Sequence, residues 1–141
     1  MAKLRKIHGI VMAVLVAVVI AGCASMGGGT VKQMTPADAS LLTGTWQGYL
    51  SPVSASNQSM TLMVKPDGTY TTSSGAFLSA GKLDIVNGHV QFTSTGGTGG
   101  LAAGQRTGSA VVYDRDRSWG LVGNGYAEMS GPFNFDLSKT K

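Results

Sequence analysis

The sequence has little of what metal, redox and hydrolytic sites are made from. Its 141 residues include one cysteine and two histidines, and 13% of them are charged. A single thiol excludes an internal disulfide, a thiolate metal cage and a paired-cysteine redox centre, because each needs at least two sulfurs. Carboxylates are scattered, and no Gly-x-Ser-x-Gly element is present. We therefore expect no catalytic residue, no metal and no cofactor, and a protein that is not an enzyme.

The net charge of +4 comes largely from the N-terminus. Lys3, Arg5 and Lys6 precede Ile10 to Ile20, an uncharged apolar run of 11 residues. This arrangement is typical of a secretory signal peptide, and the run is too short to span a membrane, which takes about 20 residues. Once the signal is removed, eight basic residues face seven acidic ones. We therefore expect no nucleic-acid partner.

The apolar run ends in a short motif of small residues. Ile20, Ala21, Gly22 and Cys23 resemble the lipobox of bacterial lipoproteins. The resemblance implies cleavage between Gly22 and Cys23, acylation of the Cys23 thiol by palmitate-like chains and acylation of the new amine. Two or three such chains hold a protein on a membrane essentially permanently. Ala24 after the cysteine resembles the outer-membrane sorting signal. The implied location is a lipid-anchored domain in the periplasm, with exposure at the cell surface as the alternative.

Composition divides the chain into three parts. Residues 1–22 form the signal peptide, which we expect to be helical until it is cleaved, and residues 23–34 form the lipidated cysteine and a glycine-rich flexible tether. Residues 35–141 form the folded domain. It opens with a capping hydroxyl, a proline and an acidic residue from Thr35 to Asp38, which predicts one or two helical turns over Pro36 to Leu42.

The rest of the domain favours strands. Asp67-Gly68 and Asn87-Gly88 each separate two alternating runs and supply the positive φ of tight hairpin turns. Short connections predict an all-β meander that closes into a small up-and-down antiparallel barrel of about eight strands, with a β-sandwich as the alternative. The expected strands cover residues 45–51, 59–65, 69–74, 109–113, 118–122 and 132–137, and two more centre on 83–85 and 90–92.

Gly44-Thr45-Trp46 follows the expected helical turn at the start of the first strand. This motif resembles the opening of lipocalins and related calycin barrels, in which the tryptophan plugs one end of the barrel. The resemblance implies that Trp46 is such a plug and that a small apolar ligand is held in the barrel mouth. The sequence departs from the pattern because no arginine follows the last strand and no C-terminal helix is visible.

Three further segments carry candidate chemistry. His89 follows the Asn87-Gly88 turn and is expected to face solvent, with Asp84 as its natural local partner. Arg115 and Arg117 lie in a charged turn and are candidates for contact with a partner, because arginine is enriched at interfaces. The glycine-rich run 96–104 lacks the Lys-Ser/Thr of a phosphate-binding loop and favours a flexible connection between strands.

Two functional hypotheses follow from these features. The first is a non-enzymatic, membrane-anchored periplasmic lipoprotein that binds a small apolar ligand or an envelope protein. The alternative is a solid-core barrel that acts through its loops, as an accessory subunit of an envelope complex or as an inhibitor of a secreted enzyme. Small eight-stranded barrels can be filled by their own side chains. The volume and lining of the interior therefore distinguish the two hypotheses.

Overall fold

A computed structural model describes residues 31–75, 77–98, 104–115 and 117–141. The predicted signal peptide, the cleavage site at Gly22 and Cys23, and residues 24–30 of the tether lie outside the described residues. Within the described part of the chain, no helix is both long and apolar enough to cross a membrane.

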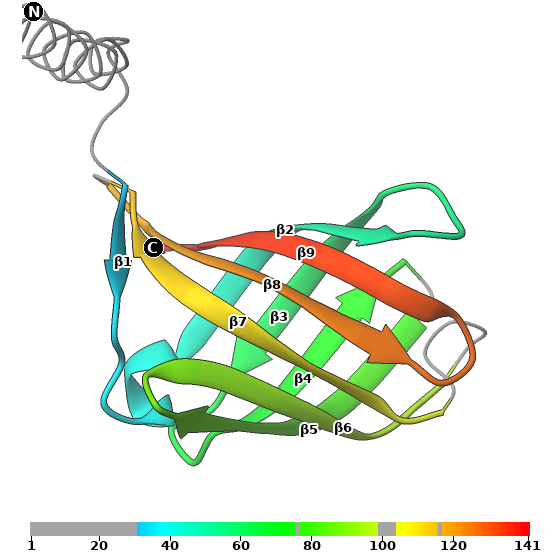
Figure 1. The fold of residues 1–141 in the computed structure, drawn as a ribbon, viewed down its shortest axis with the longest axis horizontal. Helices are drawn as coiled ribbons and strands as arrows, with labels where there is room; N and C mark the ends of the chain where they lie inside the picture. The colour runs from blue at the N-terminus through cyan, green and yellow to red at the C-terminus, as the bar shows by residue number, and fades with distance from the viewer. Residues whose placement is uncertain (1–30, 76, 99–103, 116) are drawn as a thin grey trace, which may run out of the picture.

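Eight antiparallel strands form a closed up-and-down barrel (Figure 1). Each strand pairs with the next along the chain, and the last strand pairs back onto the first, with Trp46 opposite Lys139 and Pro52 opposite Phe133. The predicted all-β barrel is thus confirmed and the sandwich is excluded. The strands are β2 (Gly44–Pro52), β3 (Gln58–Val64), β4 (Thr69–Ser74), β5 (Phe77–Val86), β6 (His89–Thr98), β7 (Arg106–Asp114), β8 (Trp119–Ala127) and β9 (Gly131–Lys139).

The two predicted glycine turns make hairpins. Asn87 and Gly88 have φ of 52° and 76° and join β5 to β6. Two consecutive positive φ values are what a two-residue type I′ turn needs, and its twist matches that of the flanking strands. Gly68, with φ of 80°, ends the turn between β3 and β4. Local turn chemistry therefore sets the register of both hairpins.

A ninth strand lies outside the barrel. It occupies the end of the segment 23–34, which was predicted to be a flexible tether. β1 (Lys32–Met34) pairs antiparallel with residues 112–114 of β7. β6 pairs with β7 only as far as Ala110. Residues 112–114 of β7 therefore have an edge that β6 does not cover, and β1 pairs with them there. The sequence pattern does not predict this strand, because three residues that pair through their backbone need no apolar alternation. Met34 nevertheless packs against the core.

The predicted helical turn forms, but later in the chain and with a different cap. η1 (Ala39–Leu42) is a single 3₁₀ turn. Asp38 is its N-cap, and the Asp38 carboxylate accepts a hydrogen bond from the Ser40 amide at 2.8 Å. Thr35 was expected to cap the helix and lies four residues before it. The carboxylate of Asp38 stands directly before the turn, where it can satisfy a free N–H group.

β5 and β6 extend further than predicted. Their pairing runs on to Leu78 and Thr98 and takes in Gly96 and Gly97, with a register shift between Ala80 and Gly81. Part of the glycine-rich segment expected to be a loop is therefore strand, because backbone pairing with β5 needs no side chains. Residues 99–103 of that segment lie outside the described residues.

The barrel has two unlike ends. Figure 1 shows η1 and β1 together at one end, which we call the helix end. At the opposite end, which we call the loop end, β2, β4, β6 and β8 finish and β3, β5, β7 and β9 begin. Alternate residues of the strands point inward and form one buried core. It consists of Leu42, Trp46, Leu50, Leu62, Val64, Tyr70, Leu83, Val90, Ala110, Val112, Leu121, Ala127, Phe133, Phe135 and Leu137.

Candidate functional site

The barrel interior holds a cavity of about 60 Å³. This is several times the ~10–15 Å³ that one water requires, yet smaller than the ~150 Å³ of an apolar cavity that takes up benzene. The core is therefore neither filled nor a large chamber. The lining residues are Leu50, Gln58, Met60, Leu62, Tyr70, Thr72, Ser74, Ser79, Leu83, Val90, Phe92, Arg106, Ala110, Leu121, Phe133 and Phe135.

Aromatic rings form much of the wall, and they lie over glycines of neighbouring strands. A Cβ atom on Gly81 would come within 2.6 Å of the Tyr70 ring, and one on Gly108 within 2.4 Å of Phe92. Gly123 has the same relation to Phe135, at 2.5 Å. These close approaches are open only to glycine. The inward glycines thus make room for rings inside a barrel of small diameter.

The rings also contact one another. The Phe92 ring lies 5.6 Å from that of Phe135, edge to face, and 6.1 Å from that of Phe133. Met60 is partly buried against the same core. Its unbranched thioether adapts to irregular space. The apolar part of the wall therefore combines fixed rings with one adaptable side chain.

Four residues in one register row cross the interior toward the loop end. Tyr70 pairs with Gly81, and Gly81 pairs with Ser94. Thr93 and Thr107 form the last pair of the ladder between β6 and β7. Ser94 and Arg106 are the next residues on these two strands, so they lie opposite each other in register. We call Tyr70, Gly81, Ser94 and Arg106 the polar row. Because Gly81 has no side chain, the end of the Tyr70 ring lies over it, with Cζ and the hydroxyl oxygen 2.6 Å from where a Gly81 Cβ atom would be.

Arg106 gives this row its charge. Among the described residues that line the cavity it is the one that carries a charge, and it is partly buried. Burial lowers the pKa of the Arg106 guanidinium. The negative charge of Tyr70, when its hydroxyl is deprotonated, acts in the opposite direction and raises that pKa. Burial also raises the pKa of Tyr70 to about 12, so its hydroxyl is protonated and able to donate a hydrogen bond at neutral pH.

Two hydroxyls in the barrel differ in how they are satisfied. Ser74 Oγ donates to the Ser59 carbonyl at 2.7 Å and contacts Gln58 Oε1 at 3.1 Å. Ser94 is 3% exposed, and its Oγ has no hydrogen-bond partner within the described part of the chain. A buried hydroxyl of this kind is uncommon, because leaving it unpaired costs about 1–3 kcal/mol.

Trp46 packs at the helix end, beside η1. Its side chain is fully buried, and its indole Nε1 donates to the Leu42 carbonyl of η1 at 2.8 Å. Lys139 Nζ lies over the rings of Trp46 and Trp119, at 5.5 and 4.9 Å from their centroids. Lys139 also donates to the Leu41 carbonyl at 3.4 Å. Lys139, within the last strand, thus places a cation over the tryptophan.

The two arginines predicted to contact a partner have different surroundings. Arg115 forms an ion pair with Asp136 at 2.9 Å and contacts Ser138 Oγ at 3.4 Å. Its side chain lies along Gly120, where a Cβ atom would come within 2.3 Å of it. Arg117 is exposed in the same turn. Both lie at the helix end, whereas Arg106 begins β7 at the loop end, and Arg117 is the more exposed of the two.

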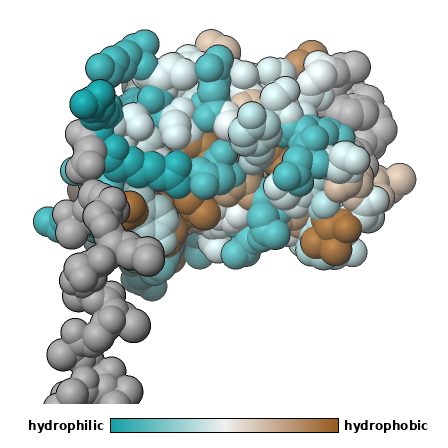
Figure 2. Space-filling model, turned by 90° about the horizontal axis from the view of Figure 1, so that it is seen from above, coloured by the Kyte–Doolittle hydropathy of each residue, from teal (hydrophilic) through white to brown (hydrophobic). Residues whose placement is uncertain are grey.

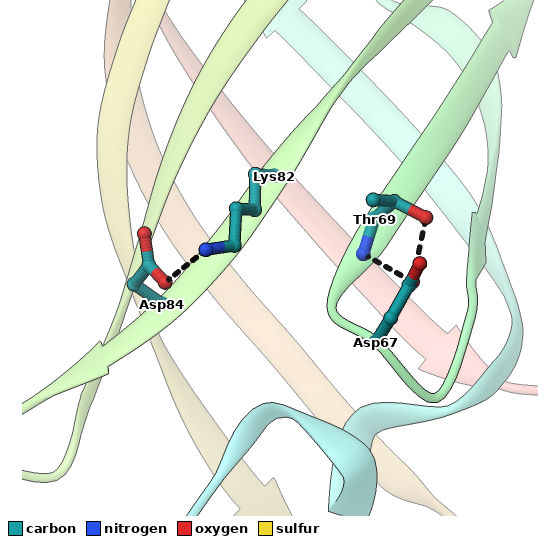
Figure 3. A network of polar contacts seen from close by, with 4 residues as sticks. All are labelled: Asp67, Thr69, Lys82 and Asp84. Atoms are coloured by element: carbon teal, nitrogen blue, oxygen red, sulfur yellow. Dashed lines mark hydrogen bonds and ion pairs between the residues drawn. The ribbon is translucent and has the colours of Figure 1, made fainter.

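The structure separates His89 from its expected partner. His89 is exposed at the tip of the β5–β6 hairpin. Asp84 instead lies 3.4 Å from Lys82, in an exposed ion pair on β5 (Figure 3). In the adjacent turn, Asp67 accepts hydrogen bonds from the amide and hydroxyl of Thr69 at 2.9 and 2.7 Å (Figure 3). These bonds lower the pKa of Asp67. Across the described residues, no three His, Cys, Asp or Glu side chains gather as metal ligands would.

The outer surface carries scattered apolar side chains. Tyr49, Val53, Tyr126 and Met129 are each more than half exposed. Figure 2 shows one face of the barrel, on which hydrophobic surface is divided into separate patches by hydrophilic side chains. Single exposed apolar residues are normal on soluble proteins. The interior therefore offers more specific chemistry than this face does.

Comparison with known proteins leaves the family open. No protein-family model, curated protein or solved structure matches this chain. The closed eight-stranded barrel is compatible with a lipocalin-like barrel.

Arg106 is not among the site residues predicted from the sequence. A signal was present, since Arg106, Gly108, Ala110 and Val112 alternate along one strand and therefore share one face. Ala110 and Val112 are both buried. Because Gly108 and Ala110 are small, the alternation of apolar and polar residues along this strand is weak in the sequence.

Proposed function

We propose that this protein is a lipid-anchored lipoprotein of the bacterial envelope whose barrel binds a small, largely apolar ligand. The observation that supports the proposal is the internal cavity of about 60 Å³, walled by aliphatic and aromatic side chains. A specific site of this kind is typically concave and apolar, with a few placed polar groups. The lipobox-like residues from Ile20 to Cys23 support the anchor, and no catalytic role is assigned to any residue.

The cavity volume limits the ligand. About 60 Å³ takes the narrow part of a molecule, such as a short alkyl chain, and a single ring would need side chains to move. Met60 is the lining residue best suited to move, because its side chain is flexible and unbranched. We expect the ligand to enter from the loop end, because Leu42 of η1 and Trp46 are fully buried at the helix end.

The proposal is tested by filling the cavity. Thr72 lines the cavity, whereas its neighbour Thr71 is exposed on the outer face of β4. The full chain is purified in a nonionic detergent, and its bound small molecules are recovered by organic extraction and mass spectrometry. We expect an apolar molecule with the wild type and with Thr71→Phe, and its loss with Thr72→Phe.

Two outcomes would contradict the proposal, and one control is needed. Recovery of the same molecule from Thr72→Phe at wild-type yield would place the ligand outside the barrel. An empty wild-type barrel that gains no thermal stability from any of a panel of short apolar compounds would favour the alternative, a barrel that acts through its surface. Thr72→Phe must retain the near-UV circular dichroism of the wild type, which shows that its core is still packed.

A further inference from the structure

We infer that the corner of the barrel at which β1 begins binds the membrane surface through anionic lipid headgroups. We call this region the tether corner, and its cations are Lys32, Arg115, Arg117, Lys139 and Lys141. The inference rests on the proposed lipid anchor, because it concerns how an anchored domain lies on its membrane. It adds a second membrane contact and an orientation, with the tether corner on the lipid and the loop end directed away from it.

Three segments that are far apart in the chain meet at the tether corner (Figure 1). Lys32 of β1 pairs in register with Asp114, the last residue of β7, and Asp114 pairs with Trp119 at the start of β8. β9 lies beside β8, with Ser138 opposite Gly120, so the C-terminal residues reach the same corner. The fold therefore gathers cations that the sequence keeps separate.

Cations outnumber carboxylates at the tether corner. Five cations stand against three aspartates in the same segments, at positions 114, 116 and 136. Asp136 is already paired with Arg115 at 2.9 Å. Lys32, Arg117 and Lys141 are exposed, and no residue in the described part of the chain forms an ion pair with them. These three side chains are therefore available to lipid phosphates, whose charged oxygens accept hydrogen bonds from cationic donors.

Two other regions of the barrel surface lack this excess of positive charge. At the loop end, the charged residues of the described chain are Arg106 and Glu128, whose charges balance. Elsewhere at the helix end, the turn between β3 and β4 lies against η1. There Asp38 and Asp67 stand against Lys65. An anionic surface therefore attracts the tether corner more strongly than it attracts either region.

The proposed anchor keeps the tether corner within reach of lipid. Seven residues separate Cys23 from Val31, the first described residue. Because a chain covers at most about 3.6 Å per residue, the barrel begins within about 30 Å of the acylated cysteine. In physiological salt the attraction between exposed charges fades over about 8 Å, so an untethered domain would rarely be held by it. The anchor makes docking an intramolecular step, which raises the effective concentration of headgroups at this corner.

The test measures how closely the helix end approaches lipid. The sequence has two tryptophans, Trp46 and Trp119, and both lie at the helix end beside Lys139. Energy transfer from tryptophan to a dansyl-labelled lipid therefore reports the approach of this end. The acylated protein is inserted into vesicles in which phosphatidylglycerol replaces a rising share of phosphatidylcholine. We expect transfer to rise with the share of phosphatidylglycerol, and the rise to disappear in high salt.

Two double variants separate the tether corner from net charge. Arg117→Gln with Lys141→Gln removes two exposed cations from the tether corner. Each cation near an anionic surface changes binding about fivefold, so this variant should dock about 25-fold more weakly and need more phosphatidylglycerol for the same transfer. Lys65→Gln with Lys82→Gln is the matched control, because it removes two exposed cations outside the tether corner. It should dock as the wild type does.

Each contrary outcome has its own meaning. Transfer that does not depend on phosphatidylglycerol would overturn this inference and leave the lipid anchor standing. Equal weakening in the two double variants would overturn the role of the tether corner, because net charge alone would then govern the contact. Failure of the wild type to float with vesicles of any composition would overturn the proposed anchor and the inference with it.

Discussion

Replacing Trp46 with phenylalanine tests how η1 is held at the helix end. The indole Nε1 of Trp46 donates to the Leu42 carbonyl at 2.8 Å, and both residues are fully buried. Phenylalanine keeps an aromatic ring but has no donor. The carbonyl would then lose this bond at a place that water does not reach. η1 would also lose its one side-chain hydrogen bond to β2 within the described residues.

The expected cost is the sum of three effects. A buried acceptor that loses its donor costs about 1–3 kcal/mol. The smaller ring leaves space against Leu42, which adds about 1 kcal/mol where the neighbours cannot fully collapse. A weaker interaction with Lys139, whose Nζ lies 5.5 Å from the Trp46 ring centroid, adds about 0.5 kcal/mol. We expect Trp46→Phe to lower the free energy of unfolding by about 2.5–4.5 kcal/mol.

Urea unfolding followed by far-UV circular dichroism measures this loss. Trp119→Phe is the matched control, since Lys139 Nζ also lies over that ring, at 4.9 Å, and Trp119 is only partly buried. The structure shows no hydrogen bond from the Trp119 indole to any residue it describes, so this variant should lose about 1 kcal/mol or less. Equal losses in the two variants would refute the stabilising role of the Trp46 hydrogen bond.

Three further predictions concern the wall, a turn and the anchor. Gly123→Ala places a Cβ atom 2.5 Å from Phe135 Cζ and should cost about 1–3 kcal/mol in urea unfolding. Hydrogen bonds from Thr69 lower the pKa of Asp67. They therefore stabilise the fold above about pH 4, and this stabilisation is lost as the pH falls through the lowered pKa. Asp67→Asn should be less stable than the wild type at about pH 7 and equally stable at about pH 2. Cys23→Ser should abolish membrane retention, and a variant that still sediments with membranes in high salt would contradict the lipoprotein assignment.

The strand order of the barrel could be predicted because local signals agreed with the global fold. Asn87-Gly88 and Asp67-Gly68 fix two hairpins by backbone conformation alone, and alternation assigns the faces of the strands beside them. β1 could not be predicted in this way. Its three residues are held by the free edge of β7, which exists only once the rest of the sheet has formed.

The candidate site was harder to predict than the fold. Trp46 stood out from its motif, and its burial at the helix end follows from its place on the first barrel strand. The polar row joins residues from four strands, and its alignment depends on the register shift between Ala80 and Gly81. A shift of one residue moves every side chain beyond it to the other face. Sequence patterns do not specify such a shift, so Arg106 and Ser94 could be brought together only by the structure.

The pairing of β2 with β9 also governs when the domain can finish folding. These two strands are the first and the last of the barrel, so their ladder joins residues that are far apart in the chain. Non-local pairing of this kind forms slowly, because a long loop must be closed before any contact stabilises it. Until β9 is in place, β2 and β8 each keep an unpaired edge that can template association with another chain. A newly made chain is therefore most prone to aggregation in the interval before residues 131–139 join the sheet.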